Sequence, residues 1–375
     1  MWRLSIFADD LTGAADTAAM FVEHGCDVVV AFGTGLEECK INSGVTAYSL
    51  ATRDISPQGV AQQWSRLPET AISERFAYLK VDSTLRGNVG ASIRCFAKLL
   101  QVDAVLLCPA FPQQRRQVAG DSLLLDGQKI CSITALLAAQ GCTTSLTVAD
   151  PKECQGLLTT LRRQATVDDP IVLVGSAMTV RELEAWATFL ADPGVRIASA
   201  GSAGLAGALA NLTANQPVNI ASSSPKVARG RTIAIIGSRT NLSKRQCDRL
   251  AARHDVRVVR GLPQRADDWL LHDELHRPHL LWMTPSTEEL NRIALPAAPS
   301  FNLRPQFTTL ILSGGDTAEQ QLLACGCNCM TIQGQLQPGI PVGSIETNRI
   351  WSVILKSGGF GDDDALTRVI DRVGI

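Results

Sequence analysis

The chain has 375 residues, of which 45% are hydrophobic and 19% are charged. This composition supplies enough apolar material for a sizeable core and excludes a disordered chain. The formal net charge of -1 gives no global field of either sign, which argues against duplex nucleic acid or an anionic membrane as the main partner. Small molecules are therefore the expected partners, and the sequence leaves open whether the chain forms a homodimer.

The chain shows no sign of a secretory signal or a membrane segment. The apolar run from Met1 to Ala8 meets two aspartates and is too short for a signal peptide, so we interpret it as a first β-strand. No later stretch approaches the roughly 18 uncharged apolar residues that a membrane helix needs. The eleven cysteines are scattered in apolar segments, so we expect reduced thiols and a cytoplasmic protein.

Apolar, β-branched runs alternate with helix-like stretches along the chain. This rhythm predicts an α/β fold, with helices packed on largely parallel sheets. At roughly 150 residues per domain, the length indicates two domains. The predicted strands include residues 26–32, 102–108, 171–174, 232–236, 280–283 and 308–312.

A short polar segment separates two such series of strands. Residues 221–226 combine small polar side chains with Pro225, and Gly230 follows, which is typical of a linker. We place the boundary near residue 225, so that residues 1–225 and 226–375 each form an α/β domain.

Two aspartates, Asp9 and Asp10, come directly after the first predicted strand and before an apolar helix. Open α/β sheets bind their ligands at such strand ends, and carboxylates there can accept hydrogen bonds from the hydroxyls of a polyol. Either Asp10 or Thr12 is expected to cap the helix. Because two adjacent aspartates exceed what a cap requires, we assign a functional role to at least one of them.

The densest polar cluster in the sequence lies between Lys80 and Gly90. A substrate with a carboxylate and several hydroxyls needs this mixture of residues, since Arg86 can form a bidentate pair and Asp82 can accept from OH groups. The alternative is a capped helix start with solvated Lys and Arg side chains. Arg53 follows another extended run and is a weaker candidate for an anion ligand.

A rigid loop with two prolines, Cys108 to Pro112, leads to the basic pair Arg115 and Arg116. The pair could face the site or simply face water. The sequence leaves these two alternatives open.

Three strand-turn-helix segments with small residues in the turn lie in the second half of the chain. They follow the predicted strands that end near Ile236, Leu312 and Leu355. Such turns present free backbone N–H groups and the positive end of a helix dipole to an anion. One alone could be a packing turn, but three of them predict one convergent site for an extended phosphorylated ligand.

Other nucleotide and metal patterns are weak. Neither the P-loop pattern nor the dinucleotide fingerprint occurs in these turns, so the nucleotide fold would be unusual. The glycines from Gly201 to Gly207 have the wrong spacing for a dinucleotide loop, and we interpret the segment as a close-packed helix. Cys325, Cys327 and Cys329 lack the spacing of structural zinc sites, which favours a buried or edge-strand position over a metal site.

Five segments occur in the same order as in the four-carbon acid sugar kinases, and the sequence resembles that family from end to end. The resemblance implies an N-terminal acid-sugar domain, 1–225, a C-terminal nucleotide domain, 226–375, and an active site in the cleft between them. It also implies ATP-dependent phosphorylation of an acid such as D-threonate, D-erythronate or 3-oxo-tetronate. The five segments are Asp9 to Ala14, Lys80 to Gly90 with its Asp-Ser-Thr-x-Arg-Gly-Asn core, Cys108 to Pro112, Ser313 to Thr317 and Lys356 to Gly361.

The resemblance also implies the roles of individual residues. The implied substrate contacts are Asp9, Arg53, Lys80, Val81, Asp82, Ser83, Thr84 and Arg86. The implied nucleotide contacts are Ser238, Gly314, Gly315, Asp316, Thr317, Lys356, Ser357, Gly358 and Gly359. The chain departs from the family at Gly359, where asparagine is more frequent, and in being shorter, mostly in its second half.

These roles combine into an expected mechanism, in-line transfer of the γ-phosphoryl group of ATP to a hydroxyl, most simply the terminal one. Positioning and charge stabilisation would supply most of the catalysis. Arg53, Lys80 and Arg86 would hold the substrate carboxylate and orient the polyol, while Asp9 or Asp82 takes the proton of the acceptor hydroxyl. Mg²⁺ is expected to neutralise the phosphates, although no sequence pattern fixes its ligands.

Two other classes of function remain as alternatives. A dinucleotide-dependent dehydrogenase fits the α/β rhythm, but the fingerprint of its cofactor site is missing. A non-catalytic sensor of a sugar acid or a nucleotide would share all of the motifs described above.

Overall fold

The computed structural model of the chain describes residues 3–38, 44–72, 76–163, 165–192, 194–213, 225, 227, 230–260, 279–283, 307–346 and 350–373. The chain divides into two compact units, Met1–Ala221 and Ser222–Ile375. The predicted linker, residues 221–226, lies outside the described residues except for Pro225.

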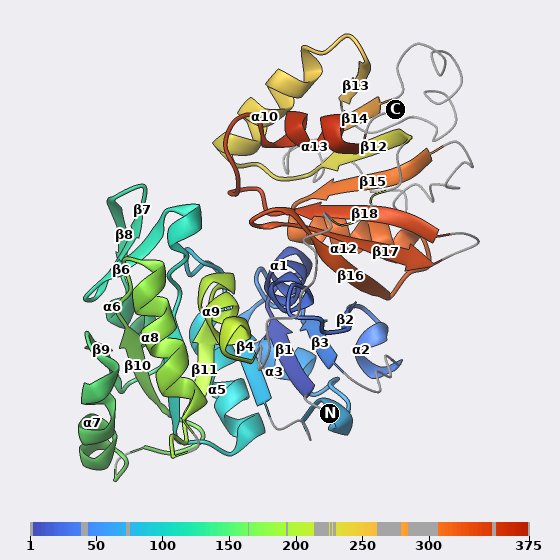
Figure 1. The fold of residues 1–375 in the computed structure, drawn as a ribbon. Coiled ribbons are helices and arrows are strands. Elements are labelled where there is room, and N and C mark those ends of the chain that lie inside the picture. Colours follow the sequence, from blue (N-terminus) through green and yellow to red (C-terminus); the bar gives the residue numbers. More distant parts are fainter. Residues whose placement is uncertain are drawn as a thin grey trace. The chain divides into compact units, whose positions relative to one another are not determined.

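The first unit contains a sheet whose strands run parallel in the order β2-β3-β1-β4-β11-β5-β10-β9 (Figure 1). The central strands are buried on both faces, which explains their continuous apolar sequences. Their bounds are β1 Arg3–Ala8, β2 Val28–Ala31, β3 Gly44–Ser49, β4 Phe76–Lys80, β5 Ala104–Cys108, β9 Ser145–Val148, β10 Ile171–Gly175 and β11 Ala198–Gly201.

Helices connect these strands, as the parallel arrangement requires. They are α1 Leu11–Val22, α2 Gly35–Glu38, α3 Pro57–Trp64, α4 Glu69–Ile72, α5 Val89–Leu100, α6 Ile133–Ala139, α7 Cys154–Leu161, α8 Val180–Ala191 and α9 Ala203–Thr213, with the 3₁₀ turns Pro112–Gln114 and Pro151–Glu153. A second, antiparallel sheet consists of β6 Arg116–Ala119, β7 Ser122–Leu125 and β8 Gln128–Ser132.

The glycines before and within α9 serve close packing, as the sequence indicates. A Cβ on Gly201 would lie 2.2 Å from the carbonyl oxygen of Cys108, and one on Gly204 would lie 2.5 Å from that of Ala110. No side chain fits at either position, because real Cβ atoms do not approach a carbonyl oxygen so closely.

The second unit contains a mixed sheet in the order β13-β14-β12-β15-β18-β17-β16 (Figure 1). The first five of these strands are parallel, and the last two pairings are antiparallel. The strands are β12 Arg231–Ile236, β13 Val256–Arg260, β14 His279–Met283, β15 Phe307–Ser313, β16 Cys329–Gln337, β17 Ile340–Glu346 and β18 Ile350–Lys356; the helices are α10 Asn241–Ala251, α12 Gly315–Ala324 and α13 Ala365–Val373.

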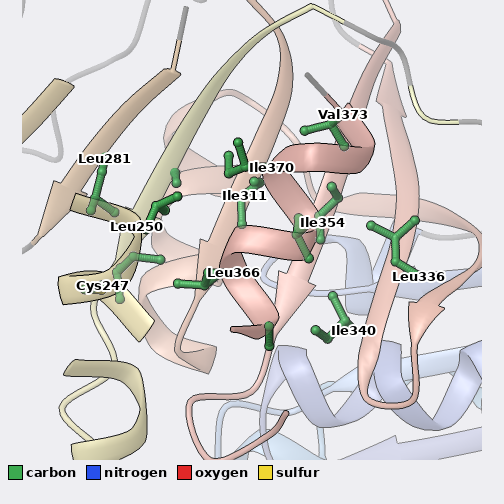
Figure 2. Close-up of a cluster of buried hydrophobic side chains, with 14 of the residues drawn as sticks. Cys247, Leu250, Leu281, Ile311, Leu336, Ile340, Ile354, Leu366, Ile370 and Val373 are labelled. Carbon is green, nitrogen blue, oxygen red and sulfur yellow. The ribbon is translucent and has the colours of Figure 1, made fainter. Parts of the chain in front are cut away.

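Helices α10 and α13 cover one face of this sheet. Figure 2 shows side chains from both helices, including Leu250, Leu366 and Ile370, packed against strand residues such as Ile311 and Ile354. The apolar face of α13 repeats every three or four residues, as expected for a helix that lies on a sheet. The predicted α/β class and the six predicted strands are therefore confirmed.

The described helices and cysteines bear on two further features of the sequence, membrane segments and metal sites. None of the helices in the described part of the chain combines the length and apolarity that crossing a bilayer requires. Cys327 is buried, Cys325 is half-buried and Cys329 is exposed at the start of β16. Among the described residues, no three His, Cys, Asp or Glu side chains are grouped so as to hold a metal ion.

Candidate functional site

Three of the predicted substrate segments meet at one edge of the sheet in the first unit. Strands β3, β1 and β4 are neighbours, and the register aligns Ala8 with Ser49 and with Lys80. The polar segments that follow these strands therefore begin side by side at the carboxyl edge, where open α/β sheets bind ligands.

The two adjacent aspartates after β1 have different partners. Asp10 is the N-cap of α1, and its Oδ1 accepts a hydrogen bond of 2.7 Å from the amide of Gly13. Asp9 instead receives two hydrogen bonds of 2.8 Å from Nε and Nη2 of Arg53, while Nη1 of Arg53 reaches Asp10 Oδ2 at 2.5 Å. One arginine thus bridges the capping carboxylate and its neighbour.

Asp82 completes this network from the segment after β4. Its Oδ1 lies 3.7 Å from Nη2 of Arg53. Arg86 forms a bidentate pair with Asp82, with distances of 2.9 and 2.8 Å from Nε and Nη2. Thr84 donates both its amide and its hydroxyl to the same carboxylate. Val81 and Ser83 are buried beside it.

The three carboxyls differ in proton affinity. Burial, with repulsion from Asp10, raises the pKa of Asp9 above its ordinary value despite Arg53. Burial also acts to raise the pKa of Asp10, but Arg53 and Lys80 outweigh it and lower that pKa. For Asp82, the hydrogen bonds and charges of Arg86 and Arg53 overcome burial and hold the pKa far below the usual range. Asp9 is therefore the better proton acceptor of the two predicted candidates.

Lys80 lies under the start of α1. The residue is only 4% exposed. A Cβ added to Gly13 would lie 2.7 Å from both Lys80 Nζ and Asp10 Oδ1. Gly13 is thus required here for space, because it lets the ammonium group approach the first turn of the helix closely.

The loops that carry these side chains support one another. Asn88 donates hydrogen bonds of 2.8 Å to the carbonyls of Thr52 and Ile55, on both sides of Arg53. Gly87 has a φ of +84° and packs against the Arg53 backbone. Leu85, at φ 59°, adopts a left-handed conformation that a non-glycine residue takes only when its surroundings impose it. These contacts tie the predicted substrate segment to the loop that carries Arg53.

Two charged residues outside the predicted set lie near this network. Asp16 of α1 is 2% exposed, and its charge interacts with those of Lys80, Asp10 and Arg116. Arg116 is 6% exposed, whereas Arg115 is exposed and pairs with Asp126 at 3.0 Å. The basic pair is thus split, one member facing inward and the other outward. A sequence signal for Asp16 did exist, namely an aspartate within an apolar helix.

The second unit brings its three glycine-containing turns together. Strands β12, β15 and β18 are parallel neighbours, so their carboxyl ends share an edge. The carbonyl of Gly358 accepts hydrogen bonds from Thr240 at 2.8 Å and Ser243 at 3.0 Å, and Ser243 also donates to Ser238. The amide of Gly314 donates to the carbonyl of Lys356 at 3.2 Å. The predicted convergence of these turns is confirmed.

Tight contacts between the turns explain their glycines. A Cβ on Gly358 would lie 1.7 Å from the Ser238 hydroxyl oxygen, and one on Gly237 would lie 1.8 Å from Thr317 Oγ1. Helix α10 begins after its N-cap Thr240, and α12 begins after Gly314, which has a φ of +103°. The amino ends of both helices therefore lie at this edge, where their dipoles favour an anion.

Other predicted nucleotide residues differ in exposure. Gly315, Thr317, Ser357 and Gly359 are half-buried at the same edge, and Asp316 is exposed in the first turn of α12. Lys356 is fully buried, and its Nζ donates a hydrogen bond of 2.9 Å to the carbonyl of Ser357. Burial lowers the pKa of Lys356 to about 7. In this conformation the Lys356 side chain binds the carbonyl of the next residue, within the turn that follows β18.

Replacing Asp16 should change the pH dependence of stability. Burial raises the pKa of Asp16 from 3.8 to about 7, so the folded state binds more protons than the unfolded chain between these values. Stability from this group is full below the unfolded pKa and is lost as the pH rises to 7. The loss is roughly 4 kcal/mol at most, at 1.36 kcal/mol per pKa unit.

The Asp16→Asn variant does not titrate at this position, so its free energy of unfolding relative to wild type should rise from pH 4 to pH 8. Urea unfolding at several pH values measures the difference. Parallel stability curves for the two proteins would contradict the assignment of a proton to Asp16.

Comparisons with known proteins agree with this division of the chain. Residues 4–209 match the model of a sugar-binding N-terminal domain, and residues 287–366 match that of a nucleotide-binding C-terminal domain. The crystal structure of a protein from Salmonella typhimurium LT2 has the same fold, with a TM-score of 0.73, 20% identity and full coverage of both chains. A Haemophilus influenzae protein gives a TM-score of 0.65 at 19% identity, over 96% of this chain and 97% of that one.

Curated relatives cover almost the whole chain. The D-threonate kinase of Cupriavidus necator is 27% identical, over 96% of this chain and 95% of the relative. The 3-oxo-tetronate kinase of Pectobacterium atrosepticum is 25% identical, over 98% of each. The sugar-binding model alone spans more than half of the 375 residues. The resemblance inferred from the five ordered segments is therefore confirmed, and the chain belongs to the family of four-carbon acid sugar kinases.

Proposed function

We propose that the protein transfers the γ-phosphoryl group of ATP to an alcohol group, the terminal hydroxyl in the simplest case, of a four-carbon sugar acid such as D-threonate or D-erythronate. A 3-oxo-tetronate or another short acid sugar is the alternative substrate. The observation that carries the proposal is the network of Asp9, Arg53, Asp82 and Arg86 at one sheet edge, in a chain whose full-length relatives are kinases of such acids.

The charges of this network suit an acid with several hydroxyls. Arg86 has a side chain that is 56% exposed, so part of its guanidinium surface is open to a substrate carboxylate. The carboxylates of Asp9 and Asp82 can accept hydrogen bonds from hydroxyls in addition to those from arginine. Arg53 already contacts three carboxylates, which supports a role in orienting them as well as in charge balance.

The proton of the acceptor hydroxyl goes to Asp9 in this proposal. A general base works best when its pKa lies near the working pH, and burial raises the pKa of Asp9. The low pKa of Asp82 makes that residue a poor base and a strong hydrogen-bond acceptor. Lys80, at the end of β4, would contact the polyol together with Val81, Ser83 and Thr84.

The nucleotide would lie on the glycine turns of the second unit, in a domain proposed to comprise residues 226–375, with residues 1–225 as the acid-sugar domain. The amino ends of α10 and α12 offer backbone N–H groups to the phosphates. Ser238 and the residues from Gly314 to Thr317 and from Lys356 to Gly359 are the proposed contacts. These contacts resemble a phosphate cradle without a P-loop.

Mg²⁺ would neutralise the phosphates during transfer. It commonly uses one or two protein carboxylates and completes its shell with phosphate oxygens and water. Asp316, exposed in the first turn of α12, offers such a carboxylate beside the turns.

The rival functions make different predictions. The parallel sheets also suit a dehydrogenase, but the glycine turns lack the dinucleotide fingerprint. A non-catalytic sensor would bind the acid and the nucleotide without releasing ADP. The kinase proposal rests on the names of the full-length relatives together with the buried carboxylates, which a sensor does not need as bases.

ADP release tests the proposal directly. With saturating ATP and Mg²⁺, a panel of four-carbon acids including D-threonate, D-erythronate and 3-oxo-tetronates should contain at least one that stimulates ADP formation. The phosphorylated acid should appear in equal amount by mass spectrometry. Binding of an acid without ADP release would favour the sensor, and a nicotinamide absorbance change would favour the dehydrogenase.

Arg86→Ala should remove binding of the acid and leave binding of the nucleotide intact. The change deletes a bidentate, charge-assisted pair with Asp82, so kcat/KM for the acid should fall at least about 100-fold. The matched control is Arg66→Ala, because Arg66 is also a partly exposed arginine paired with an acid, Glu37. Wild-type kinetics in the Arg86 variant would show that the substrate assignment is wrong.

Gly358→Ala should weaken ATP binding by at least about tenfold and leave acid binding unchanged. Its Cβ would overlap the Ser238 hydroxyl, so the turn has to move away from the turn after β12. Isothermal titration with ATP measures the effect. Gly156→Ala is the control, because a Cβ at that exposed helical glycine meets no atom within 4 Å. Equal ATP affinity in both variants would show that the turn containing Gly358 is not part of the nucleotide site.

A further inference from the structure

Asp16 has the features of a functional side chain but no assigned role. It lies in the second turn of α1 and is 2% exposed. Its Oδ1 is buried and accepts no hydrogen bond from the part of the chain that the structure describes. An isolated buried carboxylate is costly, and it persists when a nearby charge or a ligand compensates for it.

The charges around Asp16 come from a small set of residues. Helix α1 packs against α9, β1, β2, β3 and β4. The sequences of α9 and β2 contain no ionisable side chain, and the other three strands contribute Arg3, Tyr48, Tyr78 and Lys80. Tyr78 donates its hydroxyl hydrogen to the carbonyl of Ser202, and Arg3 lies exposed at the far end of β1. The charges acting on Asp16 are those of Lys80, Asp10 and Arg116.

Helix geometry relates Asp16 to the ammonium group of Lys80. Residues three apart on a helix lie on one face, so Asp16 follows Gly13 along the face of α1 over which Lys80 Nζ lies. Two carboxylates thus lie along the face of α1 that Lys80 Nζ covers. Asp10 caps the start of the helix, and Asp16 lies one turn beyond Gly13. Lys80 is also the first residue of the predicted substrate segment.

We propose that Asp16 is a positioning residue that acts through Lys80: the negative charge of its buried carboxylate, one helical turn beyond Gly13, attracts the Lys80 ammonium group and keeps it in the orientation that binds the sugar acid. This inference rests on the proposed function, and it adds a residue that does not itself touch the substrate. When Asp16 is protonated, it no longer attracts the Lys80 ammonium group. The negative charge of Asp10 then draws the ammonium group toward the helix cap.

The orientation of Lys80 by Asp16 should depend on pH, because only the ionised form of Asp16 attracts the ammonium group. Burial raises the pKa of Asp16 to about 7, with Lys80 and Arg116 opposing the shift and Asp10 adding to it. Asp16 therefore changes from mostly neutral at pH 6 to mostly ionised at pH 8. Acid-sugar affinity should increase across this interval, because the carboxylate that orients Lys80 becomes available.

A titration that does not need catalysis tests the link between the two residues. In protein labelled with ¹³C at the aspartate carboxyls, one resonance that is absent from Asp16→Asn should titrate near pH 7. Lys80→Met removes the opposing positive charge, so that resonance should shift to a pKa higher by about one unit or more. An Asp16 resonance that titrates near pH 4, or that ignores Lys80→Met, would overturn the inference even in an active kinase.

Kinetics test the positioning role. For D-threonate, or the most active acid of the panel, Asp16→Asn should lower kcat/KM about tenfold at pH 8 and much less at pH 6, with KM for ATP within about twofold of wild type. Asp16→Glu should restore part of the loss at pH 8. An equal loss at both pH values, or no loss, would contradict the proposal.

Thr17→Val is the matched control, because Thr17 is the next residue of the same helix and its hydroxyl is also buried without a partner among the described residues. Its kinetics and the Asp16 titration should equal those of wild type. A Thr17 variant with the same pH-dependent loss would show that any disturbance of α1 has this effect, and would overturn the specific role of Asp16. If no acid in the panel is phosphorylated, the proposed function fails, while the carboxyl titration still decides the link between Asp16 and Lys80.

Discussion

The guanidinium of Arg53 lies among three buried carboxylates, and the candidate acid site depends on this arrangement. It contacts Asp9 and Asp10 after β1 and approaches Asp82 after β4. Removing one partner from such a buried network costs roughly 3–5 kcal/mol, because it leaves an uncompensated charge. The three loops therefore keep a common geometry, and the hydrogen bonds of Asn88 to the backbone around Arg53 reinforce it.

The same network separates the chemistry of neighbouring carboxyls. Asp9 and Asp10 are adjacent in sequence, yet the pKa of Asp9 is raised and that of Asp10 is lowered. Asp10 gains the helix cap and the Gly13 amide, which stabilise its charged form. Asp9 lacks that cap and is repelled by the charge of Asp10. One turn and one arginine thus give two adjacent carboxyls, Asp9 and Asp10, pKa values that are shifted in opposite directions.

Particular residues show how far the sequence could predict this arrangement. Strand ends were predictable because apolar runs stop at Asp9, Lys80, Ser238 and Gly314, and parallel neighbours then align those ends. Side-chain direction was not predictable. Arg115 and Arg116 are equivalent in sequence, but Arg115 has a φ of 61° that turns the chain there, so that only Arg116 is buried. The sequence likewise gives no sign that Lys356, an implied nucleotide contact, is fully buried by the packing of its strand.

The two candidate sites are built from different groups, and this difference suits the ligands proposed for them. The candidate acid site, at the carboxyl ends of β1, β3 and β4, contains arginines paired with carboxylates. Such full charges can distinguish a substrate carboxylate from the hydroxyls beside it. The glycine turns after β12, β15 and β18 are joined by hydroxyl-to-carbonyl and backbone bonds, and the amino ends of α10 and α12 lie at the same edge. A phosphate that must leave during each turnover is better held by many weak donors than by one buried ion pair, since such a pair would also stabilise the product. The buried Lys356 agrees with this difference between the two sites. In this conformation its Nζ donates a hydrogen bond to the carbonyl of Ser357, in the turn that would hold the phosphate.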